Sequence, residues 1–319
     1  MFTVAHTILM RDHYIVTPVR NAVRTIDATI WSIVSQAGDV HVHYHVQDGQ
    51  SSDGTIEKVA AWARRLERIQ GELPARVTFT FASEPDNGMY DAIRKGFARM
   101  DIPADAFMSW CNADDALWPG ALDAVVRLAN DLPTVDWIMG WQAWFDDNSR
   151  LTAIDRNPHF PRSIVSAGMA DGIHWQFIQQ ESTFWRKRLW DRVGGLNPSL
   201  RLAGDWDLWH RFADHASLVH AQRQLGAFFV RPGQQSADLQ AYWAEVNRLV
   251  PMAARRKNFR RSSRDGRGFV TIPIATQGSN GIWQLGERTC RPRAMMYARL
   301  LRRSPVVSPL MTRLFCKIW

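Results

Sequence analysis

The spacing of apolar residues in the first half of the chain alternates between the period of a strand and that of a helix. Four short runs rich in β-branched and aromatic residues predict strands over 13–17, 40–47, 76–81 and 105–111. Apolar residues at helical spacing between these runs predict helices over 24–36, 56–66 and 89–100, and Pro119 is a suitable first residue for another helix. The alternation predicts an α/β fold with a mostly parallel sheet covered by helices on both faces.

The loops that follow these strands contain many acidic residues. In a parallel α/β sheet, ligands bind at the carboxyl ends of the strands, so the loops should meet at one edge. We expect an acidic rim there, which would accept an anionic ligand only together with a cation. Its members are Asp48, Asp53, Glu84, Asp86, Asp114 and Asp115.

The second half of the chain is less regular. Residues 140–154 predict two strands joined by a turn, and residues 179–195 predict a short strand and a helix that ends at Gly194. A compact helix is expected over 204–215 and a strand over 225–230. Residues 255–268 have too little apolar content to pack, which indicates a loop or linker.

The charge is distributed unevenly along the 319 residues. Residues 1–250 carry 24 Lys and Arg against 29 Asp and Glu, whereas residues 251–319 carry 15 against 2. We therefore expect a domain over 1–250 and a basic C-terminal extension with amphipathic helices over 251–319. The slightly acidic first part argues against a broad nucleic-acid-binding surface.

Composition and the N-terminal sequence indicate a cytoplasmic protein. The chain is 46% hydrophobic, which is enough for a sizeable core. The three cysteines have no disulfide or metal-ligand spacing, and the N-terminus lacks the pattern of a signal peptide. No stretch reaches the roughly 18 to 20 apolar residues that a membrane-spanning helix needs.

Asp114 and Asp115 directly follow the fourth predicted strand. Two adjacent carboxylates at a strand end suit a hard cation such as Mg²⁺ or Mn²⁺, which binds one or two carboxylates together with substrate phosphates. The alternative is that one of them caps the following helix. Taken alone, the pair leaves both interpretations open.

Five blocks of sequence resemble family 2 glycosyltransferases, which are nucleotide-sugar-dependent inverting enzymes of the GT-A fold. The blocks occur in the order found in that family, within residues 13–236. They are TPVRNAVRTIDATIWSIVSQ (17–36), VQDGQSSDGT (46–55), SEPDNGMYDAIRKGFA (83–98), CNADDALWPGAL (111–122) and QQESTFWRKRLWDRVGGLNPSLRLAGDWDLWHRF (179–212).

The resemblance implies a nucleotide pocket at the first blocks. Thr17, Pro18 and Asn21 would shape it, and Asp48 would accept a hydrogen bond from a uracil ring, as an acceptor-only carboxylate can. Asp48 could instead be a turn residue before a glycine. Arg94 and Lys95 would contact the nucleotide or balance the acidic rim, although solvated basic residues are the alternative.

The resemblance also implies roles in catalysis. Asp114 and Asp115 would hold Mn²⁺ or Mg²⁺ and, through it, the departing diphosphate, and Asp114 would also contact the nucleotide. The family's general base corresponds to Asp205, with Gly204 where Glu is usual, and Asp207 would be structural. Burial beside tryptophans would raise the pKa of Asp205 toward the working range of a base.

Further residues are expected around the sugars. His174, Gln180 and Glu181 precede the acceptor-side strand and could contact sugar hydroxyls, although Glu181 could equally be a capping or paired carboxylate. Arg231 resembles a family arginine in the loop that closes over the diphosphate, but Gly233 replaces the usual histidine.

The sequence thus favours a metal-dependent inverting glycosyltransferase. The donor would be a nucleotide-sugar, with UDP as the expected nucleotide, and the acceptor a saccharide or a lipid-linked sugar in cell-surface polysaccharide or glycolipid assembly. A nucleotidyltransferase would need a glycine-rich phosphate loop, which residues 17–24 lack. A non-catalytic protein that binds nucleotide-sugars or nucleic acid is the remaining alternative.

His41, His43 and His45 occupy alternate positions of a predicted strand. Side chains two residues apart on a strand share a face, so a zinc ion could bridge two of these imidazoles. No further ligand is evident in the sequence, and an ordinary polar strand face explains the three histidines without a metal.

The C-terminal segment 308–319 (SPLMTRLFCKIW) has an apolar stripe flanked by basic residues. Such a helix could lie on an anionic membrane surface, or the stripe could pack on the domain. If it binds membrane, the protein should float with anionic liposomes, and deletion of the segment should abolish flotation because both the stripe and its charges are lost. Equal flotation of the two proteins would contradict a membrane-binding tail.

Overall fold

A computed structural model describes residues 11–156, 160–234, 238–262 and 270–291. Its strands belong to one sheet, with β5 and β7 paired at the side of the main path. The strands are β1 (Asp12–Val19), β2 (His41–Asp48), β3 (Arg76–Ser83), β4 (Phe107–Trp110), β5 (Ala116–Leu117), β6 (Trp137–Phe145), β7 (Leu151–Asp155), β8 (Thr183–Arg186), β9 (Val219–Phe229), β10 (Val270–Gln277) and β11 (Trp283–Cys290).

Helices connect and cover these strands. They are α1 (Ile26–Val34), α2 (Thr55–Ile69), α3 (Met89–Ala98), α4 (Ala121–Asp131), α5 (Arg162–Ser166), α6 (Lys187–Val193), α7 (Gly204–Phe212), α8 (Leu239–Leu249) and α9 (Met252–Ser262), with 3₁₀ turns η1 (Gln70–Glu72) and η2 (Gln180–Ser182). The predicted elements of the first half are confirmed, with boundaries that differ by a few residues.

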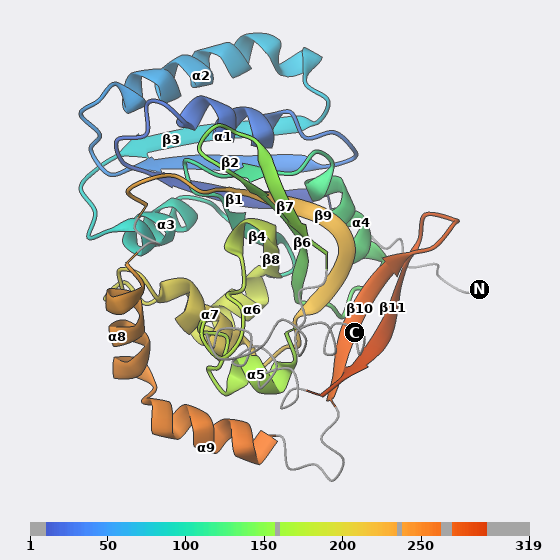
Figure 1. Cartoon of the computed structure of the whole chain (residues 1–319). Helices are drawn as coiled ribbons and strands as arrows, with labels where there is room; N and C mark the ends of the chain where they lie inside the picture. Colours follow the sequence, from blue (N-terminus) through green and yellow to red (C-terminus); the bar gives the residue numbers. More distant parts are fainter. Residues whose placement is uncertain (1–10, 157–159, 235–237, 263–269, 292–319) are drawn as a thin grey trace.

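The sheet has the strand order β11-β10-β9-β6-β8-β4-β1-β2-β3. Strands β4, β1, β2 and β3 are parallel, and so are β6, β9 and β10, whereas β8 and β11 run antiparallel to their neighbours. The mixed α/β sheet with helices on both faces confirms the fold class (Figure 1).

Alternating residues of the central strands feed two separate apolar cores. Ile15 packs with the core that contains the buried faces of α1, α2 and α4, whereas Tyr14 and Val16 pack with the core that contains α3, α5, α6 and α7. Because successive strand side chains point to opposite faces, one buried strand supplies both cores. Figure 1 shows α1 and α2 on one side of the sheet, and α3, α6 and α7 on the other.

One expectation about the C-terminal part is wrong. Residues 252–262 form helix α9, although residues 255–268 were expected to be a loop or linker. Residues 270–290 form the strands β10 and β11, and β10 pairs with β9 in the main sheet. The strands form because Ile272, Ala275 and Trp283 are buried against the sheet and its helices. The amphipathic segment 308–319 lies outside the described residues.

Helix α9 packs on the domain through a buried arginine. Its low apolar content therefore wrongly indicated a loop. The guanidinium of Arg255, 1% exposed, donates to Asp171 Oδ2 at 2.6 Å and to Asn247 Oδ1 at 2.6 Å. It also donates to two backbone carbonyls. A polar side chain that is fully hydrogen-bonded can thus occupy a core position.

None of the described helices is long and apolar enough to span a bilayer.

Replacement of Arg255 by alanine should destabilise the protein strongly. The change leaves the Asp171 carboxylate buried without its cation, which typically costs about 3–5 kcal/mol. Urea unfolding should therefore show a much lower midpoint for Arg255→Ala. Arg256→Ala, at the exposed neighbouring position, is the matched control and should unfold near the wild-type midpoint. Equal midpoints for the two variants would refute a structural role of the buried pair.

Candidate functional site

The carboxyl ends of the parallel strands meet at one edge of the sheet. The register aligns Val19, Asp48 and Ser83, the last residues of β1, β2 and β3. The backbone N–H of Cys111 donates to Val16 O, which places the segment after β4 along the same edge. The loops predicted to carry the site therefore start side by side.

Asp48 is fully buried at the end of β2. Its carboxylate accepts hydrogen bonds from the backbone N–H and hydroxyl of Ser51, the latter at 2.5 Å, and from the Ser83 hydroxyl at 2.6 Å. These contacts match the turn interpretation of Asp48, because the side chain bonds to the backbone three residues ahead. They also fix the position of the carboxylate.

The loops after β1 and β2 are joined to each other. Asn21 has a left-handed backbone with φ of 53°, its N–H donates to Ser51 Oγ, and its side-chain oxygen accepts from Ser52 N at 2.9 Å. Thr17 is buried and accepts a hydrogen bond from the Tyr44 hydroxyl at 2.9 Å, and the neighbouring Pro18 is also buried in β1. Asn21 therefore shapes this corner of the edge, and Thr17 lies beneath it.

Most acidic groups of the expected rim are engaged locally. Asp53 accepts from Val23 N and from Thr55, Asp86 accepts from Gly88 N, and Glu84 forms an ion pair with Arg99 at 2.9 Å. The hydrogen bond from Thr55 lowers the pKa of Asp53, and the one from Arg99 lowers the pKa of Glu84. Asp53, Glu84 and Asp86 therefore each use at least one carboxylate oxygen in a local contact.

Asp115 is 2% exposed and has both carboxylate oxygens engaged. Oδ1 accepts from Phe229 N at 3.1 Å and Oδ2 accepts from Asn112 Nδ2 at 3.2 Å. Burial, and then the charges of Glu181 and Asp114, raise the pKa of Asp115 well above its usual range.

Glu181 lies against Asp115 and is equally buried. Gln180 Nε2 donates to Glu181 Oε1 at 2.6 Å, whereas Glu181 Oε2 has no hydrogen-bond partner among the described residues. Burial raises the pKa of Glu181 to about 7. The charge of Glu181 in turn opposes ionisation of the buried Asp115 carboxyl group. The alternative to a sugar contact for Glu181 was a capping or paired carboxylate on the surface. Glu181 is instead buried beside Asp115.

Asp114 is the more accessible of the two adjacent aspartates. Its Oδ2 accepts from Gln234 Nε2 at 3.0 Å, and the same nitrogen donates to Phe229 O. Gln234 was not a predicted site residue, and its only signal in the sequence was its place in the loop assigned to the diphosphate.

Arg231 belongs to this same loop after β9. Its guanidinium lies over the Phe229 ring, 5.4 Å from the ring centroid, and its backbone N–H donates to Gln234 Oε1. Arg231 Nε is buried and has no hydrogen-bond partner among the described residues. The structure therefore brings Asp114, Asp115 and the Arg231 loop together, with a buried donor available to an anion.

Asp205 lies in the first turn of α7 and is partly exposed. Its Oδ1 accepts from Trp206 N at 2.7 Å and from the Tyr90 hydroxyl at 3.2 Å. Burial raises the pKa of Asp205 to about 6, as expected for a base candidate. Asp207 faces elsewhere and forms an ion pair with Arg211 at 2.6 Å.

Tyr90 also explains why Gly204 stands beside Asp205. A Cβ atom at position 204 would lie 2.6 Å from the Tyr90 ring, so no larger residue fits without movement. Tyr90 lies in one of the five sequence blocks, but its contact with Gly204 and Asp205, which are far away in sequence, could not be predicted from the sequence.

His174 lies in a separate buried cluster. Its Nδ1 is 2.8 Å from Asp171 Oδ2, the carboxylate that also binds Arg255. Burial alone would raise the pKa of Asp171, but the hydrogen bonds and charge of His174, with the charge of Arg255, lower it. Within the described part of the chain, His174 forms its hydrogen bonds with Asp171 and none with Asp115 or Asp205.

The two predicted basic residues on α3 differ in their surroundings. Lys95 donates to Pro85 O at 2.6 Å and pairs with Asp91, which holds the loop after β3 against the helix. Arg94 is exposed. Lys95 therefore has a structural contact, and Arg94 is available to solvent or to a ligand.

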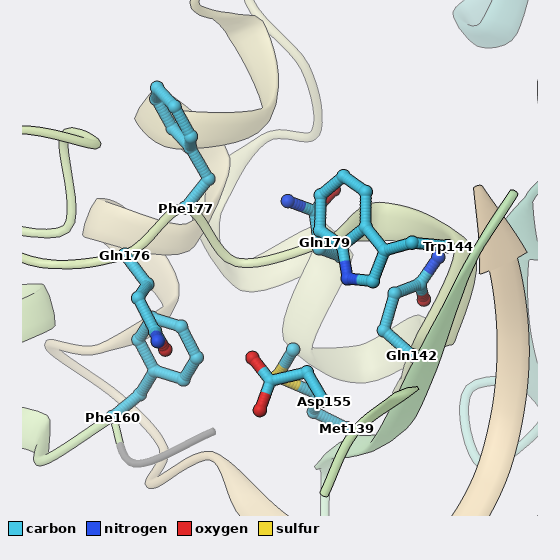
Figure 2. Close-up of a pocket in the computed structure, with 8 residues that line it drawn as sticks. All are labelled: Met139, Gln142, Trp144, Asp155, Phe160, Gln176, Phe177 and Gln179. Atoms are coloured by element: carbon cyan, nitrogen blue, oxygen red, sulfur yellow. The ribbon is translucent and has the colours of Figure 1, made fainter. Parts of the chain in front are cut away.

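A cavity of about 200 Å³ opens beside η2, between β6, β7 and the segment before η2. Figure 2 shows aromatic rings, amides and one carboxylate around it, with Asp155 turned toward the side where Phe160 and Gln176 lie. Phe177 packs edge-on against Tyr242, which lies close enough to Asp205 for the two groups to interact electrostatically. The lining residues are Met139, Gln142, Trp144, Asp155, Phe160, Gln176, Phe177 and Gln179.

The family model described as "Glycosyl transferase family 2" matches residues 14–192, which is more than half of the chain. The chain belongs to glycosyltransferase family 2. The family membership that the ordered sequence blocks predicted is therefore confirmed.

One solved structure supports the GT-A fold of this family 2 member. A fragment of S. aureus TarS in complex with UDP-GlcNAc has a TM-score of 0.52 and 14% identity, over 75% of this chain and 65% of that one. This family 2 chain thus spans less than two thirds of that TarS fragment. A mannosyltransferase from Pyrobaculum calidifontis in complex with GDP-Man and Mn²⁺ has a TM-score of 0.47 and 15% identity, over 80% of this chain and 75% of that one. A search of curated proteins found no significant match.

The residues at Asp114 fit a hard divalent cation. Asp114 offers a partly exposed carboxylate, and Asn112 Oδ1 is a buried oxygen without a hydrogen-bond partner among the described residues. Mg²⁺ and Mn²⁺ bind through one or two protein oxygens when substrate phosphates complete the shell. Asp115 is less suited to direct coordination, because its oxygens already bind Phe229 N and Asn112.

Proposed function

We propose that this glycosyltransferase moves a hexosyl or N-acetylhexosaminyl group from a nucleotide-sugar to a hydroxyl group of a saccharide or lipid-linked acceptor. The configuration at C1 would invert. The observation that carries the proposal is the Asp114–Asp115 pair beneath the Arg231 loop, in a family 2 chain that also holds a partly exposed carboxylate of raised pKa at Asp205.

The donor nucleotide would bind along the carboxyl edge of β1 and β2. Asp48 would accept the uracil N–H, in addition to its three donors from Ser51 and Ser83, since a carboxylate has about four acceptor positions. Thr17, Pro18 and Asn21 would shape the pocket wall. UDP is the favoured nucleotide because TarS, which shares the fold, was solved with UDP-GlcNAc. Arg94 and Lys95 on α3 would flank the nucleotide.

Asp114 would hold Mn²⁺ or Mg²⁺, with Asp115 and Gln234 fixing its position. The bound cation would neutralise charge that develops on the diphosphate as it leaves. The unpartnered Arg231 Nε would donate to the same diphosphate and draw its loop over the donor.

Asp205 would act as the general base. The acceptor oxygen forms a bond to C1 of the sugar while the bond from C1 to the diphosphate oxygen breaks, and Asp205 takes the proton of the acceptor hydroxyl. A direct displacement on the opposite face inverts the configuration and needs no enzyme nucleophile. The Tyr90 hydroxyl orients the carboxylate.

The cavity beside η2 is a candidate acceptor pocket. Aromatic faces such as Trp144 and amides such as Gln142 and Gln179 suit the apolar faces and hydroxyl groups of a sugar. Gln180 and Glu181 adjoin its wall through η2 and would orient the donor or acceptor sugar. His174 would support this region through Asp171.

The cell-surface role and the location are extensions of this proposal. A transferase for polysaccharide or glycolipid assembly would work in the cytoplasm, at the inner face of the membrane when its acceptor carries a lipid. The basic segment after residue 291 would supply the attraction to anionic lipids.

Replacement of Asp205 by asparagine should cut turnover by about 10² or more while donor affinity stays near wild type, because the base is lost but the nucleotide site is intact.

For the wild type, kcat should fall about tenfold per pH unit below pH 6, since protonation of the Asp205 carboxylate, whose pKa is raised to about 6, removes the base. Transfer, or the slower hydrolysis of the donor, measures both effects.

The exposed residue Asp214 provides the control for this experiment. Asp214→Asn should keep both the rate and the pH profile. A near-wild-type rate for Asp205→Asn would assign the base to another residue.

Removal of the divalent cation should abolish turnover. Excess chelator should stop the reaction, Mn²⁺ or Mg²⁺ should restore it, and Asp114→Asn should raise the Mn²⁺ concentration needed for half-maximal rate by at least about tenfold. A panel of nucleotide-sugars scored by thermal stabilisation with Mn²⁺ first identifies the donor. Full activity in excess chelator would contradict metal dependence.

A further inference from the structure

A second group of metal-ligating side chains lies at the opposite edge of the sheet. Asp12 begins β1 and His41 begins β2, and the parallel register pairs these two residues. His43 follows on the same face of β2. Asp48, at the nucleotide edge, ends the strand that His41 begins. The group is therefore separated from the catalytic edge by the full length of β2.

The three side chains converge on one carboxylate oxygen. Asp12 Oδ1 lies 3.1 Å from His41 Nδ1 and 2.7 Å from His43 Nε2, and the ligand atoms all lie within 4.8 Å of one another. Zinc bonds of about 2.0–2.1 Å in a tetrahedron separate neighbouring ligand atoms by about 3.3 Å. Small side-chain movements would open the group to that spacing.

Neighbouring residues hold both imidazoles in position. His41 Nε2 lies 2.9 Å from Thr78 Oγ1, which can accept the N–H of the tautomer that leaves Nδ1 free to bind a metal. The His43 ring stacks on Tyr14, with centroids 4.3 Å apart and planes 4° apart. The second histidine is therefore fixed by packing.

The charges beside the group act on a cation in opposite directions. Arg76 repels a cation, and the Asp12 carboxylate attracts it. The side chain of Asp12 is 45% exposed, so an ion can reach the group from solvent.

His45, the third histidine of this strand face, is not part of the group. Its Nδ1 lies 2.8 Å from Thr80 Oγ1 and its Nε2 lies 3.2 Å from Gln47 Oε1. The third potential ligand is Asp12 rather than His45. The sequence pattern alone did not connect Asp12 with His41 and His43.

We propose that Asp12, His41 and His43 bind a divalent transition-metal ion of the Zn²⁺ class, with water in the open position. The site is distinct from the cation seat at Asp114 and joins the starts of β1 and β2. Two nitrogen ligands favour such a metal over Mg²⁺, which prefers oxygen. Its effect is on the stability of the strand pair, because a ligand that binds only the folded state stabilises it.

The test is a titration of the tag-free full chain, stripped of metal, with Zn²⁺ in the absence of nucleotide. Calorimetry should show one ion per chain bound at this site, and Co²⁺ should give the visible absorption of a tetrahedral nitrogen–oxygen site. Zn²⁺ should also raise the melting temperature. The variants His41→Gln, His43→Gln and Asp12→Asn should each weaken binding at least about tenfold, the loss typical when a metal contact is removed.

Two variants control for binding elsewhere. His215→Gln removes an exposed histidine outside the group, and Asp114→Asn disables the proposed catalytic cation seat. Both should bind Zn²⁺ as the wild type does. Unchanged Zn²⁺ affinity in His41→Gln and His43→Gln, or no Zn²⁺ binding by the wild type, would overturn the proposal. Loss of the ion in Asp114→Asn would overturn it as well, by placing the ion at the catalytic edge.

Discussion

The buried contact of Asp115 with Glu181 connects the parts of the fold that form the proposed site. Asp115 follows β4, Glu181 lies in η2, and Asp115 Oδ1 accepts a hydrogen bond from Phe229 N near the end of β9. Because these contacts are buried, they hold three segments that are distant in sequence in one arrangement. Asp114 and the Arg231 loop take their positions from it.

The aromatic core gives the base its position in a similar way. Trp209, on the same helix as Asp205, stacks on Trp110 of β4 with parallel rings 5.6 Å apart, and also on Trp137 of β6. Helix α7 therefore rests on the central sheet through large rigid rings. Trp110 is 1% exposed and serves packing. The sheet thus fixes the positions of both the proposed cation-binding residue Asp114 and the proposed base Asp205.

The two edges of the parallel sheet have different polar groups and different proposed roles. The carboxyl edge gathers oxygen groups and backbone N–H donors, which suit a nucleotide and a hard cation. The amino edge gathers two imidazoles around Asp12, which suit a borderline metal ion. One strand, β2, supplies groups to both edges, from His41 at its start to Asp48 at its end.

Local pattern determined the parallel α/β order, the loops that carry Asp48, Asp114 and Asp115, and the family, because strand period, helix period and short motifs depend on residues close in sequence. Tertiary structure alone decided the rest. It placed Tyr90 on Asp205, Gln234 on Asp114 and Asp12 beside His41 and His43, contacts between residues about 30 to 120 positions apart. It also turned residues 252–262 and 270–290 into a helix and two strands. The stability of these last elements comes from a buried Arg255 and from pairing with β9, which no local pattern encodes.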